Sequence, residues 1–320
     1  MLPPNLLASR RRLLVATGAA TLMAPFAGFT STALAQGAPN AQPLFRFGLI
    51  ADPQYAPVVP RRTRFYANSL WKVAEAIEAM NGEPLAFVAT LGDIIDRHWE
   101  SYAHILPVYD RLTHPHFFVL GNHDFEVARD FLGSVVRTTG LRRAYYDFEG
   151  GPANGPKWRF IVLDGNDISL FANLPGSPKH QQAQARLAAM TEAKAPNAQT
   201  WNGGLSDDQT TWLFRTMDAA EAAGQKIVVL GHYPLYPANE HNLWGWEQLS
   251  ERMAGYRHFT AFFCGHNHAG NYGEVGRKHF VNLKGMVETP DKTAFSIVSV
   301  FPDRLELKGF GLEESRVFRI

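Results

Sequence analysis

Five short apolar segments of this chain each end at side chains that can bind a metal ion. The central one, His116 to Leu120, predicts a buried strand, and Gly121-Asn122-His123-Asp124 follows it. Glycine would let the backbone turn sharply. The turn would then present an amide oxygen, an imidazole and a carboxylate at the carboxyl edge of the sheet, where open α/β sheets bind ligands. Taken alone, this tetrapeptide is equally consistent with ordinary turn chemistry.

The other four segments end in the same way, and glycine lies beside three of them. The side chains that follow them are Asp52 and Gln54, Asp93 and Asp96, His232, and His266 and His268. Carboxylates, amide oxygens and imidazoles suit Mn²⁺, Fe, Zn²⁺ or Mg²⁺. A single histidine of this kind is usually an ordinary core or surface residue. Five such strand ends are hard to explain by packing, because buried unpaired polar groups cost free energy.

We therefore predict a dinuclear metal site. Two ions about 3.5–4 Å apart form a clamp for in-line displacement at phosphorus. One carboxylate must bridge the ions. Asp93 is the candidate, because a carboxylate has two oxygens and its strand is central.

Strands alternate with helices along the chain, which predicts an α/β (α+β) fold with βαβ units and mixed sheets. Helical spacing predicts helices at 67–80, 104–112 and 180–193, and from Ser206 to about 223, where Gln209 completes a capping box. Strands are expected at 45–50, 85–91, 116–120, 143–148, 158–164, 226–230, 259–264, 280–283, 294–301, 304–309 and 316–320. The last strands follow one another by short turns, which predicts a largely antiparallel second sheet. The segment at about 166–202 is too long for an ordinary connection, so we expect an insertion or a lid.

Composition sets broad limits. The chain has 320 residues, enough for one large domain or two small ones. Its net charge of +1 suggests no nucleic-acid polymer as a partner. Cys264 is the only cysteine, which excludes an intrachain disulfide and a thiolate metal cluster.

The N-terminus has the pattern of an export signal. Paired arginines precede Leu13-Leu14, a weakly apolar stretch follows, and Ala33-Leu34-Ala35 offers a cleavage site before Gln36. The arginines resemble a twin-arginine signal, which would make that translocase an export partner. The competing interpretation is a membrane anchor, but the apolar stretch is short and interrupted by Pro25. We expect a cleaved signal at 1–35, a linker at 36–43, one domain at 44–320, no stable membrane anchor, and a periplasmic or secreted protein.

The five strand ends, in this order, resemble the calcineurin-like metallophosphoesterase superfamily over essentially the whole mature chain. The motifs are Asp52-x-Gln54, Gly92-Asp93-x-x-Asp96, Gly121-Asn122-His123-Asp124, Gly231-His232 and Gly265-His266-x-His268. The resemblance implies a four-layer β-sandwich flanked by helices. It also implies one metal on Asp52, Gln54, Asp93 and His268, and a second on Asp93, Asn122, His232 and His266.

One ligand departs from the commonest family pattern, because Gln54 replaces a histidine. An amide oxygen is a weaker donor than imidazole, which favours harder ions such as Mn²⁺. Together with Asn202-Gly203-Gly204-Leu205-Ser206 and the run from Val281 to Thr289, this resembles the manganese-dependent ADP-ribose/CDP-alcohol diphosphatases. The implied activity is hydrolysis of a pyrophosphate bond in small nucleoside-diphosphate conjugates, by metal-activated hydroxide attack on phosphorus.

Within this mechanism we expect His123 to protonate the leaving oxygen or to donate to the developing charge. Asp124 is expected to orient His123, and Asp96 to support a ligand rather than to bind metal. Substrate contacts are expected from Tyr55, Arg97, His98 and Trp244, with Trp246 and Phe171 as further aromatic candidates for stacking on a base. Packing or solvent exposure is an equal alternative for each of them.

Two other functions remain open. One is a broad phosphodiesterase or phosphomonoesterase that scavenges phosphate outside the cytoplasm, which the export signal favours because ADP-ribose is mainly intracellular. The other is a non-catalytic metal-binding interaction module, against which the complete ligand set and His123 argue.

Overall fold

The computed structural model describes residues 42–152 and 154–320. The predicted signal at 1–35 and most of the predicted linker at 36–43 lie outside the described residues, so both stay predictions. In the described part of the chain, no helix combines the length and the apolar character needed to span a membrane.

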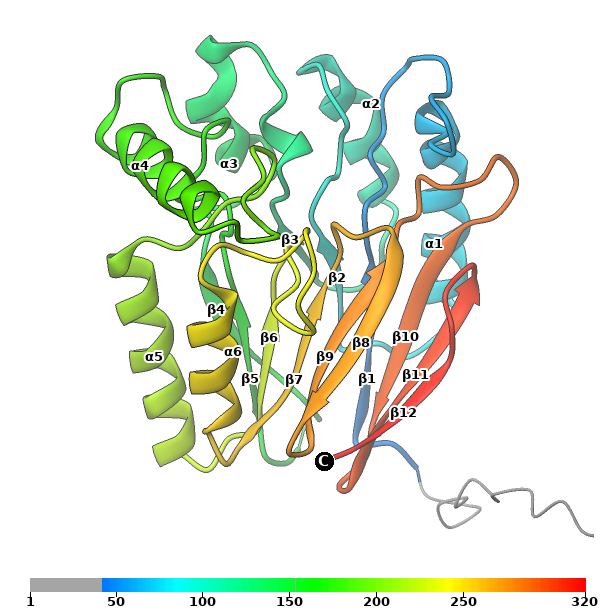
Figure 1. Cartoon of the computed structure of the whole chain (residues 1–320). Helices are drawn as coiled ribbons and strands as arrows, with labels where there is room; N and C mark the ends of the chain where they lie inside the picture. Colours follow the sequence, from blue (N-terminus) through cyan, green and yellow to red (C-terminus); the bar gives the residue numbers. More distant parts are fainter. Residues whose placement is uncertain (1–41, 153) are drawn as a thin grey trace, which may run out of the picture. The chain divides into compact units, whose positions relative to one another are not determined.

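Two six-stranded sheets form the centre of the fold (Figure 1). The first has the order β12-β11-β10-β1-β2-β3. Strand β1 pairs in parallel with β2, and β2 with β3, while β10, β11 and β12 continue the sheet antiparallel on the other side of β1. The strands are β1 (Phe45–Ile50), β2 (Phe87–Leu91), β3 (His116–Val119), β10 (Ala294–Val300), β11 (Arg304–Gly311) and β12 (Arg316–Arg319).

The second sheet has the order β4-β5-β6-β7-β9-β8. Its four central strands are parallel, and only β4 and β8 at the edges run antiparallel to their neighbours. The strands are β4 (Tyr146–Gly150), β5 (Trp158–Val162), β6 (Ile227–Leu230), β7 (Phe259–Cys264), β8 (Ala269–Val275) and β9 (Lys278–Lys284).

The sheets face each other across a core of large apolar side chains. Phe47 and Phe87 from the first sheet pack against Phe160 from the second, with ring centroids 4.7–5.5 Å apart. Such aromatic pairs stabilise a core beyond the area they bury.

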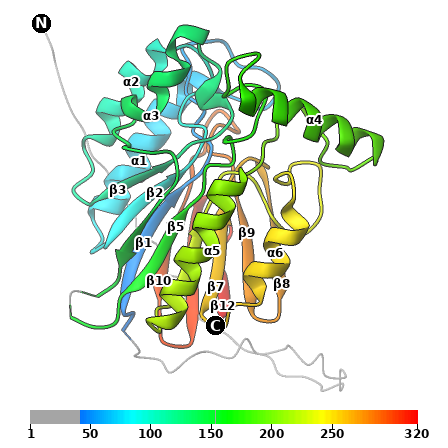
Figure 2. The same cartoon turned by 90° about the vertical axis from the view of Figure 1, so that its left-hand side faces the viewer.

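Helices cover both outer faces, which completes the four predicted layers (Figures 1 and 2). Helices α1 and α2 bury Val73, Ile77 and Ile105 against the first sheet, and α5 and α6 bury Leu213 and Met253 against the second. The helices are α1 (Ser69–Asn81), α2 (Glu100–Tyr109), α3 (Val135–Thr138), α4 (Pro178–Glu192), α5 (Asp207–Ala222) and α6 (Trp246–Ala254), with short 3₁₀ helices at Tyr66–Asn68, His123–Phe125 and Arg129–Ser134.

The predicted elements are confirmed with five corrections. The second sheet is mixed rather than largely antiparallel, because the C-terminal hairpins extend the first sheet instead. Helix α2 begins four residues earlier than predicted, and β8, α6 and the short α3 were missed.

The predicted capping box at α5 is only half formed. The Ser206 hydroxyl accepts a hydrogen bond from the Gln209 backbone N–H, as predicted. The reciprocal bond is missing, because the Gln209 side chain reaches Asp164 and Asp167 instead, and Asp167 accepts the Ser206 N–H.

Candidate metal centre

The candidate ligands gather where β1, β2, β3, β6 and β7 end, as the sequence predicts. Their backbone is unusual. In the described part of the chain, nine non-glycine residues have a positive φ in the left-handed region, and Asp52, Gln54, Asp93 and His266 are four of them. Non-glycine residues rarely adopt this conformation, and such backbone strain is concentrated at functional sites.

Glycine is required at the turns for a reason the sequence did not reveal. A Cβ on Gly121 would lie 2.2 Å from Oδ1 of Asp93, and one on Gly265 would lie 2.4 Å from Oδ2 of Asp52. These glycines therefore make room for the two carboxylates. The sharp turn proposed for Gly121 is not the reason, since its φ is not among the positive values.

Asp52, Asp93 and His268 form the first ligand group, with their ligand atoms within 4.8 Å of one another. Nε2 of His268 lies 3.8 Å from Oδ1 of Asp52. The Gln54 side chain lies between Asp93 and His268, with its Nε2 2.8 Å from Oδ2 of Asp93 and 3.2 Å from Nε2 of His268.

Asp93, His232 and His266 form the second ligand group within the same limit. Nε2 of His232 lies 3.4 Å from Oδ2 of Asp93, 3.1 Å from Nδ1 of His266 and 3.1 Å from Oδ1 of Asn122. Asp93 belongs to both groups, which is the position that a bridging carboxylate requires.

These residues fit a pair of divalent cations. All of them are buried or nearly so, yet the Gln54 Oε1 atom has no hydrogen-bond partner. Buried polar atoms are normally satisfied, so an unpaired amide oxygen among carboxylates and imidazoles indicates a metal-binding atom. Oxygen and imidazole donors without thiolate suit the harder divalent ions.

Each histidine of the two groups is oriented by an acceptor on its other ring nitrogen, as metal-binding histidines usually are. Nδ1 of His232 donates to the Leu91 carbonyl at 2.9 Å, Nε2 of His266 contacts Oδ1 of Asn202 at 2.9 Å, and Nδ1 of His268 contacts Glu288 at 2.7 Å. Sequence reasoning missed these partners. Asn202 and Glu288 lie inside motifs that it quoted, but nothing local linked them to the ligands.

The electrostatics of the centre also call for a cation. Burial raises the pKa of Asp52. Burial acts in the same direction at Asp93, but His232 and His123 outweigh it and lower the pKa of Asp93. Burial alone would lower the pKa of His232, whereas the charge of Asp93 raises it to about 9. A proton on His232 thus compensates the carboxylates, so metal binding should release protons.

His123 lies beside the centre, where its backbone N–H donates to Oδ1 of Asp93 at 2.9 Å, but its ring belongs to neither of the two ligand groups that contain Asp93. Its Nδ1 lies 3.2 Å from the Asp96 carbonyl, 3.3 Å from Oδ1 of Asp96 and 3.1 Å from Glu126. Burial would lower the pKa of His123, but Asp93, Glu126 and Asp96 raise it to about 9. Nε2 faces Arg64 at 3.5 Å. Such an imidazole is suited to donate a proton.

The expectation that Asp124 orients His123 is wrong. The Asp124 carboxylate accepts hydrogen bonds from the backbone N–H groups of Gly121, Ile94 and Ile95 and from the Tyr102 hydroxyl. It therefore joins the turn after β2 to the turn after β3. Burial and the charge of Asp93 raise its pKa to about 7.

Two of the predicted substrate contacts are not accessible. Trp244 is fully buried against Ile168 and Ala183, and its Nε1 donates to the Asn197 carbonyl. Tyr55 is buried, and its hydroxyl contacts Nδ1 of His104 at 3.0 Å. The packing alternative holds for both.

The other candidates have mixed outcomes. Arg97 pairs with Asp96 and lies over the Tyr66 ring at 5.5 Å, and His98 is exposed near Glu126. Trp246 and Phe171 pack against the apolar layer under α5 and α6.

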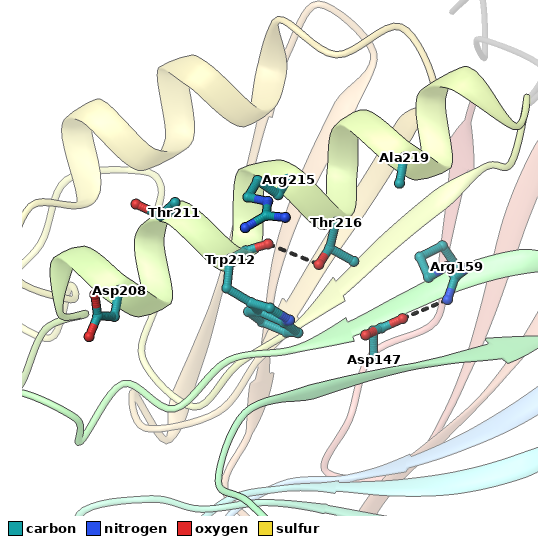
Figure 3. Close-up of a pocket in the computed structure, with 8 residues that line it drawn as sticks. All are labelled: Asp147, Arg159, Asp208, Thr211, Trp212, Arg215, Thr216 and Ala219. Carbon is teal, nitrogen blue, oxygen red and sulfur yellow. Dashed lines mark hydrogen bonds and ion pairs between the residues drawn. The ribbon is translucent and has the colours of Figure 1, made fainter.

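A cleft of about 420 Å³ opens beside the two ligand groups. Three arginines at 61, 62 and 64 line it, together with His241, His266, His268 and Glu288. A second cavity, of about 590 Å³, is lined by β4, β5 and α5 and includes Trp212 and Arg159 (Figure 3). It contains none of the candidate ligands, so the basic cleft is the candidate substrate site.

The fold and the paired ligand groups define a metal-dependent phosphohydrolase. A family model described as calcineurin-like phosphoesterase matches residues 45–270. The chain belongs to this family.

Individual relatives agree. The chain is similar to the manganese-dependent ADP-ribose/CDP-alcohol diphosphatases of Mus musculus and Homo sapiens, with 32% identity to each over 87% of this chain and 94% and 93% of the relatives. Among solved structures it is similar in fold to a dimetal phosphatase from Danio rerio, with a TM-score of 0.76 and 24% identity over 87% of this chain and 99% of that one.

Proposed function

We propose that this chain uses two Mn²⁺ ions to hydrolyse the pyrophosphate bond of small nucleoside-diphosphate conjugates, such as ADP-ribose or CDP-alcohols. The observation that carries the proposal is the cleft, which three arginines line together with His268 of the first ligand group and His266 of the second. A substrate with two adjacent phosphates can meet the metal ligands with one phosphate and the arginines with the other. The relatives named for ADP-ribose and CDP-alcohols support this substrate class.

Asp52, Gln54, Asp93 and His268 would hold one divalent ion, and Asp93, Asn122, His232 and His266 a second. Such a pair would supply a water of lowered pKa and would neutralise phosphoryl oxygens. Side chains of the protein orient the substrate and donate the proton. Arg64 orients the substrate from the rim of the cleft. His123, held by Asp96 and Glu126, donates a proton to the leaving oxygen.

A broad phosphodiesterase or phosphomonoesterase remains the alternative, because the predicted export signal favours phosphate scavenging outside the cytoplasm. The two functions differ in the leaving group.

The test is turnover by the protein from Gln36 onward, stripped of metal and reloaded with Mn²⁺. The substrates are ADP-ribose, CDP-choline, 2′,3′-cyclic AMP, bis-p-nitrophenyl phosphate and p-nitrophenyl phosphate. We expect kcat/KM for ADP-ribose or CDP-choline to exceed that for the aryl esters by at least tenfold. A preference for the aryl esters or the cyclic nucleotide would transfer the proposal to the alternative.

We further propose export of the folded, metal-loaded protein by a twin-arginine translocase to the periplasm or the medium. Replacing Arg11 and Arg12 with lysine should then retain the protein in the cytoplasm, as fractionation measures. Normal export of that variant would argue against this route.

A further inference from the structure

Lys72 is a buried cation that the proposed chemistry does not use. It lies in the first turn of α1, and no part of it is exposed to solvent. A buried ammonium is costly unless hydrogen bonds replace its water. A solvent-facing lysine on this helix would need no such partners, so the contacts made by Lys72 indicate what it is for.

Its Nζ atom is surrounded by four consecutive backbone carbonyls. It lies 2.9 Å from the oxygen of Met286, 2.8 Å from that of Glu288 and 2.7 Å from that of Thr289, with Val287 at 3.4 Å. An ammonium has three N–H donors, so three bonds are direct and the fourth contact is weaker. Segment 286–289 is thus folded around the ammonium as a loop folds around a bound metal ion.

The same segment supports the first ligand group at two points. The Met286 N–H donates to the Ala51 carbonyl at 2.9 Å, and the Val287 N–H donates to the Asp52 carbonyl at 3.0 Å. The Glu288 carboxylate contacts Nδ1 of His268 at 2.7 Å. Both Asp52 and His268 are therefore held by backbone or side chain of the segment that Lys72 organises.

Helix α1 also holds the turn that connects Asp52 to Gln54, two ligands of the first group. Ser69, one turn before Lys72, donates its hydroxyl hydrogen to the carbonyl of Pro53, which lies between Asp52 and Gln54. The Thr293 hydroxyl donates to the Lys72 carbonyl at 3.2 Å and so holds the chain that follows the segment against the same helix. The N-terminal part of α1 is thus a common support for the first ligand group.

The second ligand group has different supports. His232 is oriented by the Leu91 carbonyl and His266 by Asn202, and neither contact involves segment 286–289. Support from Lys72 therefore acts on the first metal position, and the two positions are linked by the shared Asp93 and by the Asp52 carboxylate, which accepts the backbone N–H of His266.

We propose that Lys72 is a positioning residue that preorganises the ligand group of Asp52, Gln54, Asp93 and His268 for its metal ion, acting through segment 286–289 and Glu288. The ammonium holds the four carbonyls together, and the segment in turn fixes the Asp52 turn and the ring of His268. This inference depends on the metal ligands and not on which phosphoester is hydrolysed, so metal binding tests it whatever the substrate.

The experiment measures Mn²⁺ binding to the apoprotein by calorimetry and by electron paramagnetic resonance. The variants are Lys72→Met, which keeps the length of the side chain and removes the charge, and Glu288→Gln, which interrupts only the last link. His268→Ala provides the reference spectrum for loss of the first ion. Lys278→Met is the matched control, because Lys278 also donates to two backbone carbonyls, of Arg257 and Phe259, where β7 and β9 begin rather than where the strands end at the ligand groups.

We expect Lys72→Met to bind one Mn²⁺ with the affinity of the parent protein and the other at least tenfold more weakly. At limiting Mn²⁺ the spectrum of Lys72→Met should match that of His268→Ala. Both spectra should be those of an isolated Mn²⁺ ion and not of a coupled pair. Glu288→Gln should weaken binding of the same ion, and Lys278→Met should weaken binding of neither ion. Excess Mn²⁺ should restore the spectrum of a coupled pair in Lys72→Met.

Equal weakening of both ions in Lys72→Met, or parent-like binding of both, would overturn the proposal. So would the same loss in Lys278→Met, since a general effect on stability would then explain it. If Lys72→Met does not fold, Glu288→Gln decides, and parent-like binding in that variant contradicts the proposed link to His268.

Discussion

His123 is the clearest case of a residue whose chemistry is set by its neighbours. Its ring is held by Asp96 and Glu126 on one nitrogen and faces Arg64 with the other, beside the basic cleft. Carboxylates keep the imidazole protonated, and the arginine adds positive charge where a phosphoryl oxygen would lie. The geometry matches a proton donor better than a metal ligand, because the His123 ring lies outside both ligand groups that share Asp93.

Replacing His123 with alanine should lower kcat by roughly 10²–10⁴ and leave two metal ions bound, because proton donation acts in the transition state. Steady-state kinetics together with metal analysis by mass spectrometry checks this. Loss of both ions, or an unchanged kcat, would remove His123 from the proposed chemistry.

The ligands were predictable at the scale of single residues because each follows its own strand directly in the sequence. Their supports were not predictable. Asn202 contacts His266, which lies 64 positions further along the chain. In the sequence, nothing distinguishes Lys72 from any other polar residue of a helix. Only the folded chain brings such pairs together.

At the scale of elements, the segment from 166 to 202 is built into the domain at its ends. The backbones of Ile168 and Gly204 pair, and Trp244 packs against Ala183 of α4. The Trp244 indole also donates to the Asn197 carbonyl, and Asn197 donates in turn to the carbonyls of Asn242 and Leu243. Trp244 therefore joins α4 to the loop that precedes α6.

Trp244→Ala should destabilise the fold by about 3–5 kcal/mol, because it leaves a cavity where a fully buried indole packs. Chemical denaturation measures the loss. KM should change by the same factor for ADP-ribose and for bis-p-nitrophenyl phosphate, since the ring does not face the cleft. A rise in KM confined to the nucleotide, with stability unchanged, would restore the stacking role predicted from sequence.

Elements with strong local signals were predictable and weakly signalled ones were not. Helix α5 has a serine N-cap, whereas the N-cap of α6 is Gly245, which has a left-handed conformation and offers no side chain to cap the helix. Strand β8 consists of partly or fully exposed residues at the edge of its sheet, so it lacks the apolar pattern of the interior strands.

At the scale of the whole molecule, the parallel strands of both sheets end at the same metal centre. Each sequence motif follows one of these strands, so the motifs together predicted that the strand ends meet. The pairing of the C-terminal hairpins with β1 was not predictable, because antiparallel hairpins can extend either sheet. Their register is fixed by packing of residues such as Val298 and Leu307 in the core between the sheets.

The stability of the fold should depend on pH through Asp164. Burial, with the charge of Asp167 adding to it, raises the pKa of Asp164 from 3.8 to about 7. The folded state then holds a proton that the unfolded state has released between these values. Asp164 therefore contributes a growing destabilisation as pH rises from about 4 to 7, and the full amount above that.

Asp164→Asn should remove this pH-dependent destabilisation, because the amide does not titrate. Its oxygen can still accept the Asn166 N–H, so the hydrogen bond is kept. Relative to the parent protein, the variant should gain stability with rising pH by at most ~1.4 kcal/mol per pH unit, with little difference near pH 4. Urea unfolding of the metal-free protein at several pH values measures this. A stability difference that does not change with pH would contradict the assigned pKa.

The most direct test of the whole account is anomalous diffraction from crystals soaked in Mn²⁺. We predict two peaks about 3.5–4 Å apart, one at Asp52 and His268 and the other at His232 and His266, with Asp93 between them. A single peak, or a peak at the separate group of Asp96, His123 and Glu126, would contradict a dinuclear centre at this edge of the sheets.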